Sequence, residues 1–431
     1  MILYLALFFA ALIIGMPVAL ALGIASLIFL LIEGHGHLLV AFPQRMIAGV
    51  DSFLLLTIPF FILAGNLMNA ANLTTHIVRA AQLLVGRIKG GLALVNVLTN
   101  LMLSGSSGAA TSEASAVGGI MIPPMKRDGY DPAYAAALTA TGSLLGPLIP
   151  PSLPLILFGV LTGTSIGDLF LAGIIPGLIL GGLLLAYALW KGHRENHPMA
   201  PPPPKGERWS ILRAALPAIV MPIFIVVGIR SGLFTPTEAA GVACVYALAT
   251  GIFIYRSLPW SKIKQGFFQT ATMSAGVMLV IAMASMTGFV PGIEGLPQQI
   301  PASILGVTED PVLLVILLNL VLLVLGLFLE PLAAMVLIMP VLNALAPTIG
   351  MDPVQMGVMV VMNLMIGMIT PPVGLVLFIV SSIARSPLQA VTRASIPMLG
   401  LCIFVLALVA AVPGVSLWIP SPSHACFLCF Q

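Results

Sequence analysis

The stretch Gly129-Tyr130-Asp131-Pro132 is followed after seventeen residues by Pro150-Pro151, and this arrangement occurs twice. In the second copy, Gly350-Met351-Asp352-Pro353 is followed after seventeen residues by Pro371-Pro372. A Gly-x-Asp-Pro loop at a fixed distance from a Pro-Pro pair indicates that two parts of the chain share one layout.

Further anchors flank both motifs in the same order. Glu113 stands ten residues before Pro123, and Glu330 stands ten residues before Pro340. A glycine of each later segment also falls in register, at Gly146 and Gly367. The connector is four residues longer in the second copy, but six anchors in one order predict an internal duplication.

Each copy places a glycine and a Pro-Pro pair in the middle of an apolar segment. A proline inside a helix removes a backbone hydrogen bond and clashes with the preceding turn. In a membrane, such a break survives only where it is buried in protein or lines a wet cavity. Two interrupted segments at corresponding places in two halves point to the binding site of a secondary transporter.

The composition predicts an all-α integral membrane protein. Of 431 residues, 59% are hydrophobic and 7% are charged, whereas a soluble domain has about 25% charged residues. Many apolar runs reach the roughly 20 residues that a spanning helix needs. The net charge of +3 is too small to indicate nucleic acid, so we interpret the basic residues as markers of topology.

Other chemistries have little support in the sequence. Cys426 and Cys429 have the spacing of a C-x-x-C pair, but no second pair or histidine cluster completes a metal site. A phosphate loop and a nucleophile elbow are also missing, which argues against an ATP-driven pump or a membrane hydrolase. We therefore predict that the chain is not an enzyme and has no cofactor, and no metal beyond sodium.

The predicted organisation is two halves of opposite orientation, with about ten spanning helices, two re-entrant hairpins and both termini in the periplasm. Met1–Ile32 is interpreted as the first span, bent by Gly15, Pro17 and Gly23. The predicted parts are a first half (1–190) with hairpin 92–125 and broken helix 133–161, a cytoplasmic Pro-rich linker (191–213), a second half (214–420) with hairpin 312–346 and broken helix 357–383, and a disordered tail (421–431).

Two acids lie within the apolar hairpins, Glu113 and Glu330. A charge at the centre of a membrane helix costs roughly 2.5–3.5 kcal/mol or more, which favours a functional interpretation. The alternative is that each acid is hydrogen-bonded in the wall of its hairpin and stabilises the turn. The sequence leaves both interpretations open.

The hairpin tips and the breaks opposite them are candidate cation sites, because neutral hydroxyl, amide and carbonyl oxygens suit an alkali cation. The alternative is that small residues only allow close helix packing. The first site would use Ser104, Gly105, Ser107, Gly108, Thr141, Gly142 and Gly146. The second would use Gly326, Phe328, Asn363, Gly367 and Thr370.

An anion would suit the N–H groups that become free after each break, at the start of a half-helix. This favours an organic anion as the solute. Residues assigned either to the solute or to the hairpin structure are Ser106, Thr111, Glu113, Pro150, Pro151, Glu330, Pro371, Pro372 and Gly374. The run around Thr235-Pro236-Thr237-Glu238 is interpreted as a helix cap, with Thr235 and Glu238 forming a capping box.

Two runs are specific enough to identify a family, Leu233 to Ala240 and Asn363 to Phe378. With Ser104-Gly105, Ser107-Gly108 and Met121-Ile122-Pro123, they resemble the large membrane subunit of TRAP (tripartite ATP-independent periplasmic) transporters. The resemblance covers nearly the whole chain to about Pro420. It has three departures: Glu113 stands where an aspartate is expected, Ala109 where a serine is common, and the C-terminal tail with Cys426 and Cys429 matches nothing expected of the family.

The resemblance implies several properties. The chain would work in the bacterial inner membrane with a small four-helix membrane subunit and a periplasmic solute-binding protein. A sodium gradient would drive import through an elevator movement, and the solute would be a C4-dicarboxylate, sialic acid or another sugar acid. Sodium would be bound by Ser104, Ser107 and Gly142 in one half, and by Gly326, Asn363 and Thr370 in the other. The alternatives are a stand-alone sodium–carboxylate carrier and a passive channel or scaffold subunit.

Overall fold

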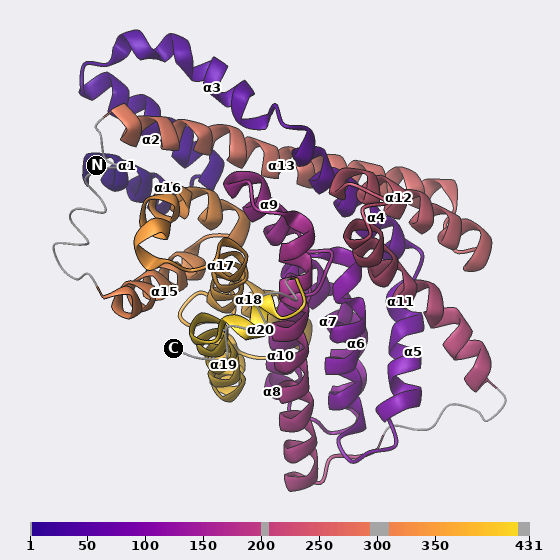
Figure 1. Ribbon diagram of the computed structural model, residues 1–431. Coiled ribbons are helices and arrows are strands. Elements are labelled where there is room, and N and C mark those ends of the chain that lie inside the picture. The colour runs from indigo at the N-terminus through magenta and orange to yellow at the C-terminus, as the bar shows by residue number, and fades with distance from the viewer. Residues whose placement is uncertain (1, 200–206, 294–309, 421–431) are drawn as a thin grey trace.

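The computed structural model describes residues 2–199, 207–293 and 310–420 (Figure 1). Within these ranges all regular elements are helices. The first half contains α1 (Ile2–Ile13), α2 (Val18–Ile32), η1 (Gly36–Val40), α3 (Ala41–Val50), η2 (Phe53–Leu56), α4 (Thr57–Ala70), α5 (Leu73–Val85), α6 (Gly91–Ser107), α7 (Ala110–Arg127), α8 (Pro132–Gly142), η3 (Ser143–Leu145), α9 (Leu153–Thr162) and α10 (Ile166–Arg194).

The second half begins after the linker. It contains α11 (Arg208–Arg230), α12 (Pro236–Ala249), the π-helical turn η4 (Thr250–Ile254), α13 (Trp260–Ile293), α15 (Pro311–Phe328), α16 (Pro331–Ile349), α17 (Pro353–Gly367), α18 (Leu375–Ala384), α19 (Leu388–Ala411) and α20 (Pro413–Leu417). The chain is therefore all-α in its described parts, as the composition predicts. The predicted tail lies outside the described residues.

The prediction that Met1–Ile32 forms one bent span is wrong. α1 ends at Ile13 and α2 starts at Val18, and the ring of Tyr4 packs edge-on against that of Phe29 at 6.2 Å between centroids. The start of α1 therefore lies beside the end of α2, so the two helices form an antiparallel pair. Gly15 at φ +88° allows the reversal, because glycine adopts this left-handed conformation without a steric cost.

One long helix, α13, connects several parts of the fold. It packs against α2, α3 and α4, and α4 packs in turn against α12. Figure 1 shows α13 running along one side of the molecule, away from α8 and α19. Seven helices of the described chain are long and apolar enough to cross a membrane. The broken spans do not count among them because each is made of two shorter helices.

The two broken spans run in opposite directions. The first is α8, η3 and α9, and the second is α17 and α18. Lys126, just before α8, donates a 2.7 Å hydrogen bond to the carbonyl of Ala384, the last residue of α18. At the other end, Gly357 near the start of α17 packs against Phe158 of α9. Because each span begins where the other ends, the two halves are inverted copies, as predicted.

Helix caps explain where the spans begin. The side chains of Asp131 and Asp352 accept hydrogen bonds from the second residues of α8 and α17, at 3.0 and 2.8 Å. Asp-Pro is a favourable helix start, because the acid satisfies an N–H group and proline needs none at the first position. The capping box of Thr235 and Glu238 is confirmed, since the two residues exchange hydrogen bonds of 2.8 and 3.3 Å.

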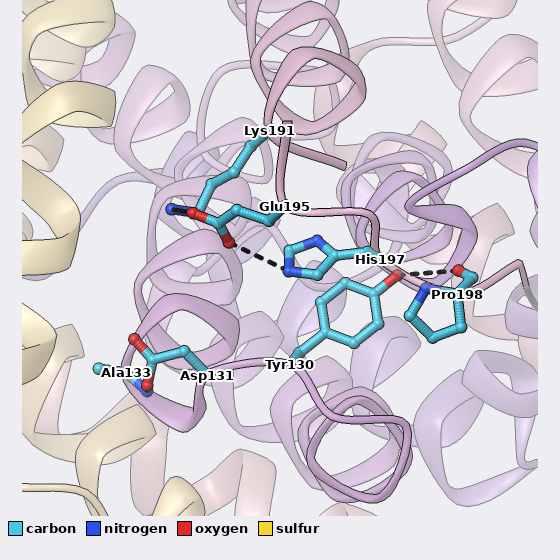
Figure 2. A network of polar contacts seen from close by, with 7 residues as sticks. All are labelled: Tyr130, Asp131, Ala133, Lys191, Glu195, His197 and Pro198. Atoms are coloured by element: carbon cyan, nitrogen blue, oxygen red, sulfur yellow. Dashed lines mark hydrogen bonds and ion pairs between the residues drawn. The ribbon is translucent and has the colours of Figure 1, made fainter. Parts of the chain in front are cut away.

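The end of α10 and the start of the linker are fastened to the base of the first hairpin (Figure 2). His197 is 8% exposed and stacks on Tyr130, with 4.2 Å between ring centroids. Its Nε2 lies 3.1 Å from a carboxylate oxygen of Glu195, which also pairs with Lys191 at 2.7 Å. Helix α10 thus extends to Arg194 inside the predicted linker, and the next residues pack against the hairpin rather than forming a free connection.

Candidate functional site

The tip of the first hairpin lies against the first broken span. α6 ends at Ser107 and α7 begins at Ala110, with Gly108 between them at φ +60°. A Cβ added at Gly108 would lie 2.8 Å from the carbonyl oxygen of Pro151, and one added at Gly105 would lie 3.1 Å from that of Pro150. Gly108 has no room for a side chain because the hairpin approaches a carbonyl group of the break at this point, and at Gly105 an added Cβ would also clash with the side chain of Pro222 in α11.

The second hairpin approaches its own break in a similar way. α15 ends at Phe328, and Leu329 and Glu330 form the tip. A Cβ added at Gly367 would lie 2.6 Å from Cα of Gly326, so the two main chains are in contact at this point. The side chain of Phe328 does not pack into this contact in the same way as Gly326, because 55% of its surface is exposed.

Both hairpin tips and both breaks meet in one place. A small cavity is lined by Gly108 of the first tip, Glu330 of the second, Pro147 of the first break and Met368 of the second. The Pro150-Pro151 and Pro371-Pro372 peptide bonds are both cis. The duplicated elements that the sequence singles out therefore converge, and the tips lie close to each other in the fold.

An amide network connects the first hairpin to α8. Asn96 donates to the hydroxyl of Thr139 at 2.7 Å, and Asn100 donates to Oδ1 of Asn96 at 3.0 Å. Asn100 presses on Gly142, where an added Cβ would lie 2.8 Å from its Nδ2. All three polar side chains are fully buried. The carbonyl oxygen Oδ1 of Asn100 has no hydrogen-bond donor among the described residues.

A comparable network connects the second hairpin to α17. Asn363 donates to Oδ1 of Asn319 at 2.7 Å and to its backbone carbonyl at 2.9 Å. Asn319 in turn donates to the carbonyl of Val315 at 2.8 Å. Asn363 is fully buried, and within the described chain its Oδ1 also lacks a donor. A buried carbonyl without a donor requires an explanation, and this one recurs in both copies.

The two acids are not equivalent in the structure. Glu113 is 2% exposed in the first turn of α7, and its carboxylate lies against Gly146 at the start of the break. Glu330 is exposed at the N-cap of α16 and makes no side-chain capping bond. Of the two hairpin acids, Glu113 is therefore the buried one, and it lies against the first break.

The described hydroxyls among the predicted ligands donate to the preceding turn of the chain. The side chains of Ser104, Thr141 and Thr370 donate to carbonyl oxygens three or four residues earlier, at 2.7 to 3.0 Å. Each hydroxyl oxygen keeps lone pairs that can face a cation. The side chains of Ser106 and Ser107 lie outside the described part of the structure.

Three other predicted residues have clear positions. Thr111 lines the cavity between the two hairpin tips and a larger polar cavity beside α7. Gly374, at φ +57°, precedes α18 and ends the second break. The first break is closed differently, because Ser152 accepts a hydrogen bond from the N–H of Leu155 at the start of α9.

Sequence reasoning missed the three asparagines that support these networks, Asn96, Asn100 and Asn319. A signal was available, because two amides four residues apart in an apolar helix lie on one helix face and are costly to bury without partners. The duplication did not show it, because Asn363 of the second copy stands where the first copy has Gly142. The first copy carries the equivalent amide on the hairpin instead.

Two oppositely oriented hairpins that meet two broken helices define an inverted-repeat membrane transporter, as opposed to an enzyme. The family profile described as "Tripartite ATP-independent periplasmic transporter, DctM component" matches residues 5–415. The chain therefore belongs to the DctM family, and it is a multi-pass membrane component of a tripartite transport system.

Known relatives align with this chain over nearly their whole length. The sialic acid TRAP transporter large permease protein SiaM of Vibrio cholerae is 39% identical over 406 residues, covering 94% of this chain and 95% of that protein. The C4-dicarboxylate large permease DctM of the same organism is 35% identical over 430 residues, covering 95% of each chain. The YdaH transporter of Alcanivorax borkumensis shares the fold, with a TM-score of 0.61 at 14% identity over 90% of each chain.

Proposed function

We propose that the chain is the sodium-coupled large subunit of an importer that carries an organic acid across the bacterial inner membrane. The observation that carries this proposal is the pair of buried amide oxygens, on Asn100 and Asn363, which have no donor among the described residues. Each lies where a hairpin packs on a broken helix. Neutral oxygens at discontinuous helices are the ligands that transporters use for sodium.

The remaining sodium ligands come from the hairpin tips and the breaks. In the first copy we assign Ser104, Ser107 and Gly142, together with carbonyl groups near Gly105 and Gly108. In the second copy we assign Gly326 and Thr370 beside Asn363. The carboxylate of Glu113 lies beside the first break, and its charge would offset that of the cation.

Transport follows from the inversion of the two halves. Two hairpins of opposite orientation can exchange roles, so that the same site opens alternately to each side of the membrane. In the proposed elevator movement, the hairpins and broken helices move as a unit past α4, α12 and α13. A periplasmic binding protein delivers the organic acid, and a small four-helix subunit packs against the stationary helices and enlarges the stationary domain. We also propose that both termini lie in the periplasm, because the basic residues then fall in loops on the cytoplasmic side.

Sodium coupling is tested by uptake into proteoliposomes that contain the complete complex. Asn363→Ala and Asn100→Ala should each raise the sodium concentration for half-maximal uptake by about tenfold, equivalent to about 1.4 kcal/mol. Asn343→Ala is the matched control, because Asn343 is exposed on α16. Uptake that is unchanged when choline replaces sodium would refute the coupling. Uptake without any binding protein would instead indicate a stand-alone carrier.

A further inference from the structure

A polar cavity of about 530 Å³ lies beside the first hairpin, outside the amide networks. One wall is the face of α7 that carries Thr111, Ser112 and Ser115. Ser115 lies four positions after Thr111 and three after Ser112, so the three share a helix face, while Glu113 and Val117 of the same helix are buried on its other side. The side chains of this wall are small and mostly polar, and the wall extends from the hairpin tip toward its base. Its volume falls in the range of about 300–1,000 Å³ that is typical of small-molecule sites.

The opposite wall is formed by helices outside the hairpins. Lys262, Gln265 and Gln269 of α13 line it at the spacing of one helix face. Asn66 of α4 lines it too, and its amide donates to the hydroxyl of Thr270 at 3.0 Å. The cavity therefore lies between the proposed moving part and the part past which it moves.

The charge of the lining is informative. Lys262 is the single ionisable residue of the lining, and the other side chains are hydroxyls, amides and small apolar groups. Its Nζ donates to the carbonyl oxygens of Ala70 and Ser257 at 3.0 and 3.3 Å. No carboxylate lies within ion-pair distance of Nζ in the described part of the chain. An ammonium group has three donors, so two carbonyl partners leave one N–H for an anion.

We propose that this cavity holds the transported solute, and that the solute is a polyhydroxylated monocarboxylate whose carboxylate binds Lys262. One positive charge balances one carboxylate, and a second carboxylate would meet only neutral groups. The amides of Asn66, Gln265 and Gln269, with the hydroxyls of α7, match the hydroxyl groups of a sugar acid. This inference rests on the proposed import function and selects one class among the organic acids.

The test uses protection of a cysteine in the cavity, which needs neither turnover nor the natural solute. Ser115→Cys is introduced into the full chain with Cys426 and Cys429 changed to serine, since Cys244 and Cys402 are buried. Labelling by a hydrophilic maleimide is measured with gluconate, N-acetylneuraminate or succinate as the probe. At least one of the two sugar acids should protect at a concentration about tenfold below that of succinate.

Variants at Lys262 show whether the charge is responsible. Lys262→Gln should raise the protecting concentration of the sugar acid about tenfold, whereas Lys262→Arg should retain most of the protection. Lys264→Gln is the matched control, because Lys264 is exposed two residues further along and does not line the cavity. The inference is overturned if neither sugar acid protects, if succinate protects equally well, or if Lys262→Gln has no effect.

The test also separates this inference from the proposed function. Sugar-acid protection without sodium-driven uptake would leave the cavity assignment in place and refute the coupling. Sodium-driven uptake whose KM is unchanged by Lys262→Gln would support the coupling and refute the assignment of the cavity.

Discussion

The two copies of the duplicated unit share a backbone plan but differ in how each closes around its break. In the first, a buried acid, Glu113, lies against Gly146, and Asn100 reaches from the hairpin to Gly142. In the second, Gly326 and Gly367 bring two main chains into contact, and Asn363 reaches from the broken helix to the hairpin. The comparison teaches that both copies keep the close contact between hairpin and break. The amide whose oxygen lacks a donor in the described chain, however, lies on the hairpin in the first copy and on the broken helix in the second.

The largest expected effect concerns the glycines of this interface. Gly367→Ala places a Cβ 2.6 Å from Cα of Gly326, where only a movement of the main chain can relieve the clash. Gly146→Ala meets the carboxylate of Glu113, which is a side chain and can shift. Overpacking costs about 1–3 kcal/mol, so we expect Gly367→Ala to lower the thermal stability in detergent more than Gly146→Ala.

Gly119→Ala is the matched control for both variants. An added Cβ at Gly119 meets no atom within 4 Å, so the thermal stability should be unchanged. Equal losses for Gly146→Ala and Gly367→Ala would show that the two interfaces are packed alike, which contradicts the comparison.

The second prediction concerns the two acids. Glu113→Gln should reduce sodium-driven uptake about tenfold or more, because it removes a buried charge beside the first break; tenfold corresponds to about 1.4 kcal/mol. Glu330→Gln should have a smaller effect, since Glu330 is exposed and caps nothing with its side chain. Initial uptake rates at matched protein amounts measure both. If Glu330→Gln reduced the uptake rate more than Glu113→Gln, the functionally important acid would be Glu330 of the second copy.

The third prediction tests a feature that the two copies share. Asp131→Ala and Asp352→Ala each remove the cap of a broken span, and replacing an N-cap residue by alanine costs about 0.5–2 kcal/mol. Because the two capping bonds are of similar length, we expect similar decreases in the free energy of unfolding, measured in mild detergent. Asp51→Ala serves as control, because Asp51 follows α3 and caps no helix start. A loss confined to one copy would show that the second cap is not needed.

The smallest expected effect concerns a contact of the first copy alone. The loop at Tyr130 is covered by His197, whereas Met351 stands at the corresponding place of the second copy. Burial lowers the pKa of His197, although Glu195 opposes this and Lys191 adds to it. Packing His197 on Tyr130 therefore favours the neutral imidazole, and forming this contact releases a proton from a protonated His197. The contact should be complete above about pH 6.5, the usual histidine pKa, and weaken as the pH falls through the lowered value.

Hydrogen exchange of the amides around Tyr130 measures this effect. After correction for the intrinsic rate, protection should fall by less than about tenfold between pH 7.5 and 5.5. His197→Phe keeps an aromatic ring on Tyr130 but cannot be protonated, so its protection should not depend on pH over this range. A pH dependence that persists in this variant would assign the titration to another group.

The sequence by itself determined the class of the protein, the duplication and the positions of the two breaks, whereas the second broken span starts at Pro353, four residues before the predicted start. These depend on local rules: proline interrupts a helix wherever it stands, Asp-Pro starts one, and a charge-poor chain of this length must lie in lipid. The inverted orientation also followed, because basic residues mark the loops on one side of the membrane.

Only the tertiary structure decided which polar groups face each other. Asn96 faces Thr139, and Asn319 faces Asn363, across more than forty residues of sequence, so no local spacing could pair them. The reversal of α1 onto α2 depended on packing between Tyr4 and Phe29, because Gly15 and Pro17 permit either a bend or a turn. The polar cavity at Lys262 arises because α7, α4 and α13 converge, and a contact between distant segments is fixed by the packing of the whole chain.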